Sequence, residues 1–75
     1  MSNKHELIYT FITEYLLAHG GVAPIAPVIA DATGISVFSV YSIVRDLVID
    51  GRLYFRVRGK YYSLTPVQEQ AKNEN

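Results

Sequence analysis

The sequence predicts an α+β domain in which three helices are followed by a two-stranded β-hairpin. Apolar residues recur at helical spacing as far as residue 50, glycines interrupt this pattern, and the period becomes alternating after Gly51. The chain has 75 residues, of which 49% are hydrophobic, so it can form one domain with a modest core. We expect the folded domain to cover residues 1–64 and the polar residues 65–75 to form a disordered tail.

The first helix is expected at residues 4–19. Asn3 and Glu6 have the spacing of a capping box, which would satisfy free N–H groups at the start of the helix. Gly20 and Gly21 favour its end, because glycine readily adopts the left-handed conformation that closes a last turn. The apolar stripe of this helix comprises Leu7, Ile8, Phe11, Ile12, Tyr15 and Leu16.

A short extended connector at residues 22–24 leads to the second helix. Pro27 suits the first turn of that helix, where its missing N–H is not needed. Thr33 and Gly34 are expected to end it. The residues expected to be buried are Val28, Ile29 and Ala32.

Ser36 is a favourable cap for a third helix, which is expected to run from Val37 to about Asp50 and to stop at Gly51. At about 100° per residue, two opposite faces emerge. The inward face comprises Val40, Ile43, Val44 and Leu47, and the outward face comprises Phe38, Tyr41, Ser42 and Arg45.

Residues 52–64 are expected to form the hairpin, with a tight turn at Arg58 and Gly59 and a returning strand at residues 60–64. Alternation directs one set of side chains to one face, namely Leu53, Phe55 and Val57, and the other set to the opposite face, namely Tyr54, Arg56 and Arg58. The formal net charge of the chain is zero, yet four of its seven Lys and Arg residues lie within the nine residues 52–60: Arg52, Arg56, Arg58 and Lys60.

Residues 36–47 and 50–53 resemble the recognition helix and first wing strand of winged helix-turn-helix regulators. Residues 19–24 and 29–36 resemble the corresponding segments of the DNA-binding domain of LexA-type repressors, and the resemblance as a whole covers roughly residues 5–64. It implies a small transcriptional regulator, repressor-like and of the kind found in phages and mobile elements. It also implies that the third helix enters the major groove of double-stranded DNA and that the basic hairpin, or wing, contacts the backbone.

The residues expected to contact DNA fall into two groups. On the third helix they are Ser36, Phe38, Ser39, Tyr41, Ser42 and Arg45. On the hairpin they are Arg52, Tyr54, Arg56, Arg58, Lys60 and Tyr61, to which Tyr62 can add a phenolic hydrogen bond. A structural alternative is that the arginines only protect an edge strand from pairing.

The outward apolar residues, Phe38 and Tyr41 above all, have three open interpretations. In the first, they are isolated exposed residues of no special function. In the second, they form a surface for a homodimer or another protein partner. In the third, they contact thymine methyl groups. The alternative function is therefore a winged-helix module for protein–protein interaction or dimerisation that uses the outer face of the third helix.

Enzymatic chemistry is not expected. The chain has no cysteine, and His5 and His19 lie at opposite ends of the first helix, too far apart to share a metal ion. Ser36 and Ser39 have no base beside them, and Asp31, Asp46 and Asp50 are interpreted as solvated helix charges. We expect no cofactor and no metal. No membrane-length apolar segment or secretory signal occurs in the sequence, so a soluble cytoplasmic protein is expected.

Overall fold

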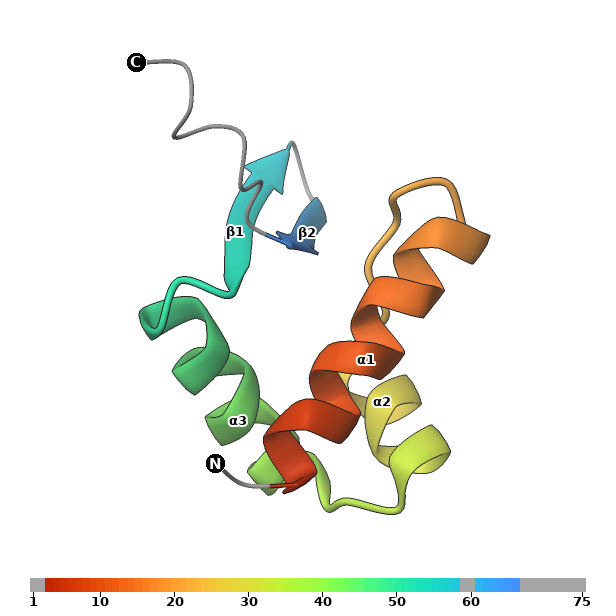
Figure 1. Ribbon diagram of the computed structural model, residues 1–75. Coiled ribbons are helices and arrows are strands. Elements are labelled where there is room, and N and C mark those ends of the chain that lie inside the picture. Colours follow the sequence, from red (N-terminus) through yellow and green to blue (C-terminus); the bar gives the residue numbers. More distant parts are fainter. Residues whose placement is uncertain (1–2, 59–60, 67–75) are drawn as a thin grey trace.

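The computed structural model describes residues 3–58 and 61–66, and for residues 57–58 and 61–62 it describes the backbone alone. The described chain is α+β: three helices precede a two-stranded antiparallel hairpin (Figure 1). The elements in chain order are α1 (Asn3–Ala18), α2 (Ala26–Thr33), α3 (Val37–Ile49), β1 (Leu53–Arg58) and β2 (Tyr61–Pro66). The predicted order of elements is confirmed.

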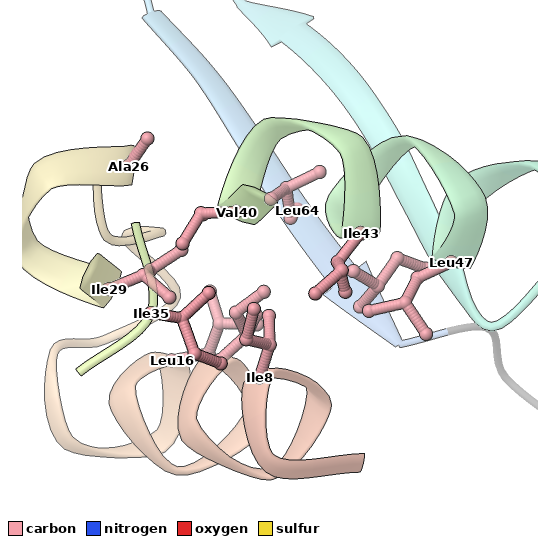
Figure 2. Close-up of a cluster of buried hydrophobic side chains, with 11 residues drawn as sticks. Ile8, Leu16, Ala26, Ile29, Ile35, Val40, Ile43, Leu47 and Leu64 are labelled. Carbon is pink, nitrogen blue, oxygen red and sulfur yellow. The ribbon is translucent and has the colours of Figure 1, made fainter. Parts of the chain in front are cut away.

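The helices pack against one another around a core to which all of them contribute. Figure 2 shows side chains from α1, α2, α3 and β2 pointing into the same interior. Every side chain in this core is apolar, and no polar or charged side chain is buried with it among the described residues. The core comprises Ile8, Ile12, Leu16, Ala26, Ile29, Ile35, Val40, Ile43, Leu47, Leu53 and Leu64. The burial of these apolar side chains in one shared core holds the helices in their positions relative to one another.

The start of α1 differs from the expected capping box. The helix already includes Asn3, and the carboxylate of Glu6 binds the guanidinium of Arg52 at the beginning of the hairpin. A partner with a full positive charge forms stronger hydrogen bonds than a backbone N–H does. Glu6 therefore joins two distant elements. Leu7, expected in the apolar stripe, is exposed, whereas Ile8, Ile12 and Leu16 are buried as predicted.

The buried face of α2 also differs from the prediction. Ile29 is buried as expected, but Val28 and Ala32 are exposed and Ala26 is buried instead. With only eight residues, α2 presents a single narrow stripe to the core, and Ala26 and Ile29 lie three residues apart on that stripe. Pro27 lies in its first turn, as predicted.

The hairpin continues from the end of α3 and lies beside α1 (Figure 1). Its pairing runs from Leu53 opposite Pro66 to Arg58 opposite Tyr61. Arg58 is therefore a strand residue and not part of the turn, and the connecting residues 59–60 lie outside the described chain. The strand β2 also continues through Pro66, two residues beyond the expected end of the hairpin. Proline has no N–H for a ladder bond and is therefore found in edge strands, and both strands of this two-stranded sheet are edge strands.

The prediction that Leu53, Phe55 and Val57 face inward is confirmed only in part. Leu53 is 2% exposed, whereas Phe55 on the same face is 48% exposed. Leu64, which pairs with Phe55, is buried. Phe55 borders an open cleft between the hairpin and the helices, and this explains why its ring is only half covered. The side chain of Val57 and the tail from residue 67 lie outside the described part.

Candidate nucleic-acid interface

The connection between α2 and α3 sets the direction of the candidate recognition helix. It consists of Gly34, Ile35 and Ser36, and the two helices are bent by 108° at this break. Gly34 has a φ of 76°, a left-handed conformation that favours glycine, and its N–H donates to the carbonyl of Ala30. Ile35 is buried, so the turn is held against the core and the bend is fixed by packing.

Ser36 and Ser39 form the N-terminal cap of α3. The hydroxyl of Ser36 accepts a hydrogen bond from the backbone N–H of Ser39 at 3.2 Å and donates one to the Ser39 hydroxyl at 3.1 Å. This is the capping role that the sequence indicated for Ser36. Both serines were also expected to contact DNA, and the structure shows them bound to each other at the start of the helix.

The outer face of α3 is exposed as the helical period predicted. Phe38 is 86% exposed and Tyr41 is 58% exposed, and Ser42 and Arg45 are exposed as well. Ile49, further along the same face, is 72% exposed. The opposite face of α3 is buried at Val40, Ile43 and Leu47, as Figure 2 shows. This surface combines apolar side chains with one cation.

Arg52 lies where the hairpin meets the helices and is bound within the molecule. Its Nη1 and Nη2 donate to the two carboxylate oxygens of Glu6 at 2.6 and 3.1 Å. Its guanidinium carbon also lies 4.2 Å from the centre of the Tyr9 ring. A bidentate pair that is also stacked on an aromatic ring has the geometry in which arginine binds most specifically. The structure thus places this expected DNA contact in an internal contact between α1 and the residue that directly precedes β1.

The ion pair shifts the titration of both partners. The hydrogen bond from Arg52, together with its positive charge, lowers the pKa of Glu6 below its ordinary value of 4.5. The same bond to Glu6 raises the pKa of Arg52. Both shifts favour the charged forms, so the pair remains ionised at neutral pH.

Tyr54 and Arg56 lie further along the hairpin, within strand β1. Both are exposed, and the guanidinium carbon of Arg56 lies 5.6 Å from the centre of the Tyr54 ring. The other hairpin residues expected to contact DNA cannot be placed in the same way. The side chains of Arg58, Tyr61 and Tyr62 and the whole of Lys60 lie outside the described chain.

An apolar cleft of about 310 Å³ opens between part of the hairpin and the helices. Tyr41 and Val44 of α3 form one wall, and Phe55 and Leu64 of the hairpin form another. The remaining lining residues are Pro24, Ala26, Ile29 and Val40. The cleft therefore lies along the side of α3, next to its exposed face.

Two histidine contacts were not foreseen from the sequence. Nε2 of His5 lies 3.1 Å from Oδ2 of Asp46, which joins α1 to α3, and Nδ1 of His19 lies 2.9 Å from the carbonyl oxygen of Tyr15. Asp46 is thus paired and not simply a solvated charge. Within residues 3–58 and 61–66, no three His, Asp or Glu side chains gather where they could hold a metal ion.

No single helix in the described ranges is long and apolar enough to cross a membrane. The pair α2 and α3 reaches that length and composition only as a unit that is bent by 108°.

Comparison with known proteins gave no matching family model, no matching curated protein and no matching solved structure.

Proposed function

We propose that this chain is a winged helix-turn-helix domain that binds double-stranded DNA as a small cytoplasmic regulator of transcription. The observation that carries the proposal is the α2–turn–α3 unit, whose bend of 108° over a three-residue turn with glycine is the geometry of a helix-turn-helix. The segments that resemble LexA-type repressor domains support the same assignment.

In this proposal α3 enters the major groove. The groove of B-DNA is about 12 Å wide and accepts a helix together with its side chains. The residues expected on the outer face, namely Phe38, Tyr41, Ser42 and Arg45, are all exposed. Arg45 is the only long cation among them, so it binds a guanine edge or a phosphate beside it.

The hairpin contributes affinity through the phosphate backbone. Arg56 is exposed at the outer part of β1, and Tyr54 beside it can donate a phenolic hydrogen bond to a phosphate oxygen. Arg58, Lys60 and Tyr61 follow within five positions and add charge and hydrogen-bonding capacity to the same hairpin. Arg52 has a different role, because its guanidinium already binds Glu6.

The test is a titration of the protein against random-sequence duplex DNA by fluorescence anisotropy, at several salt concentrations. Binding should weaken steeply with salt, since each phosphate that is neutralised releases counterions. Arg45→Ala and Arg56→Ala should each weaken binding, and Arg56→Ala should reduce the salt slope by about one. Lys4→Ala, which removes the same charge from α1, is the matched control and should leave the slope unchanged.

Two results would contradict this proposal. One is the absence of detectable binding to any duplex at low salt, where electrostatic attraction is strongest. The other is equal loss of affinity in Arg45→Ala, Arg56→Ala and Lys4→Ala, because this would mean that only net charge matters and that α3 and the hairpin form no specific interface.

A second candidate function is protein–protein interaction or dimerisation through α3. The apolar cleft beside Tyr41 and Phe55 favours it, because clefts lined by aromatic side chains accommodate apolar groups of a partner. In this case Tyr41→Ala with Phe55→Ala would abolish self-association measured by sedimentation equilibrium. Duplex DNA would have no effect on the same association.

A further inference from the structure

Phe38 occupies the position on α3 at which a recognition helix makes its base contacts. In helix-turn-helix proteins, the N-terminal residues of the second helix reach the base edges. Phe38 is the second residue of α3 and is 86% exposed, more than the other large apolar residues of this helix. An aromatic ring is therefore the most exposed large apolar group that this end of α3 offers to a ligand.

The hydroxyl group of Ser36 in the same turn already serves the cap of the helix. Ser36 accepts a hydrogen bond from the Ser39 backbone and donates another to the Ser39 side chain. Using Ser36 for a base contact would weaken the cap of the helix, which typically contributes about 1 kcal/mol to stability. In the first turn of α3, the ring of Phe38 is therefore more accessible to a ligand than the capping hydroxyl of Ser36.

Among the bases, thymine alone offers a matching apolar group. The major-groove edges of guanine, adenine and cytosine carry hydrogen-bond donors and acceptors, whereas thymine adds its C5 methyl group. A phenyl ring has no donor or acceptor for polar edges, and it gains free energy by covering a methyl group. Building on the DNA-binding function proposed above, we propose that Phe38 makes α3 select thymine by contact with this methyl group.

The charge of the outer face favours DNA over a protein as the occupant. Phe38, Ser42 and Arg45 recur at positions i, i+4 and i+7, so the cation lies on the same stripe as the ring. Burying an unpaired guanidinium in an apolar protein contact would be costly. In the major groove, guanine edges and nearby phosphates provide Arg45 with a partner.

The experiment begins with selection of bound sites from a random duplex library by the full chain. Each thymine of the selected site is then replaced singly by deoxyuridine, which retains every hydrogen-bonding group and removes only the methyl. We expect one or two replacements to lower affinity by about fourfold, the factor that burial of one methylene-sized group carries. A cytosine placed at such a position should bind more tightly once it carries a 5-methyl group.

Variants assign the effect to Phe38. Phe38→Ala should bind the thymine and deoxyuridine duplexes equally, while Phe38→Leu should retain part of the difference. Leu17→Ala is the matched control, because Leu17 on α1 is also 86% exposed, and it should retain the full difference. Thermal unfolding of both alanine variants should match that of the parent chain, since each side chain is almost fully solvated.

The outcomes separate this inference from the function on which it rests. If the chain binds duplex DNA but does not distinguish thymine from deoxyuridine at any position, the role of Phe38 is refuted and the DNA-binding function stands. If Phe38→Ala instead converts a dimer to a monomer and the deoxyuridine duplexes bind normally, the face serves a second copy of the chain and the inference is overturned. If no duplex is bound, the proposed DNA-binding function is refuted, and the role of Phe38 in selecting thymine is refuted with it.

Discussion

Arg52 and Arg56 lie four residues apart on the same hairpin, yet their surroundings are opposite. Arg52 makes a bidentate ion pair with Glu6 and stacks on Tyr9, whereas Arg56 is exposed and its guanidinium lies over the Tyr54 ring. Next to Arg52, Leu53 enters the core together with Leu64. We call Arg52, Leu53 and Leu64 the hairpin root.

The comparison shows that one short hairpin combines two tasks. The root attaches the hairpin to α1 and α3 through apolar burial and one ion pair, and the part beyond it presents Tyr54 and Arg56 to solvent. A charged interface needs a fixed base, because a freely moving arm would lose conformational entropy on binding. Arg52 and Arg56 carry the same charge, but Arg52 attaches the hairpin to α1 and Arg56 is presented to solvent.

The largest expected effect is on stability when the root is truncated. Leu53→Ala should lower the free energy of unfolding by about 2–5 kcal/mol, because it removes a buried side chain and leaves a cavity. Tyr54→Ala, one residue further along and 54% exposed, should change it by less than about 0.5 kcal/mol. Urea denaturation followed by circular dichroism measures both. Similar losses in the two variants would mean that the root is not packed as described.

A smaller effect is expected for the ion pair of the root. Arg52→Gln and Glu6→Gln should each lower the urea midpoint, by less than Leu53→Ala does, and the double variant should lose little more than either single variant. Arg52→Gln should also leave the salt slope of DNA binding unchanged, in contrast to Arg56→Ala. A slope reduced to the same extent by both would show that Arg52 contacts phosphate.

The same pair predicts a dependence of stability on pH. The pKa of Glu6 is lower in the folded chain than its ordinary value of 4.5, so its contribution is complete above pH 4.5 and disappears as the pH falls through the folded pKa. The stability difference between the parent chain and Arg52→Gln should therefore shrink below pH 4.5. A difference that stays constant from pH 7 to pH 3 would exclude the pair as its cause.

The smallest expected effect on stability is that of Arg56→Ala. Its guanidinium lies 5.6 Å from the centre of a single exposed ring, so removing it should change the free energy of unfolding by no more than about 0.5 kcal/mol. A loss comparable to that of Arg52→Gln would erase the distinction between the root and the exposed part of the hairpin.

Local rules were sufficient for α3. The period of α3 predicted Val40, Ile43 and Leu47 on its buried face and Phe38 on its exposed face. The cap at Ser36 was also predictable, because it depends on residues within one turn. In each case the cause of the structure lies a few positions away in the sequence.

Contacts between distant residues were not predictable in this way. Glu6 fits a capping box by local spacing, but its partner Arg52 is 46 residues away and forms stronger, charge-assisted bonds. Arg52 was expected to contact DNA like the other hairpin cations, because its position in the sequence does not reveal its distant partner Glu6. Phe55 fits the inward alternation of β1, yet whether an inward residue is covered depends on the elements that face it.

The pairing of Leu53 with Pro66 has a consequence for building fusions of this protein. A partner joined directly after Pro66 is attached at the base of the hairpin, opposite the residue that enters the core. The six residues of β2 span roughly 17 Å, so this attachment point lies about that far from Tyr61 at the other end of the strand. A fluorescent reporter attached there would leave the outer end of the hairpin free for the DNA contact that we propose.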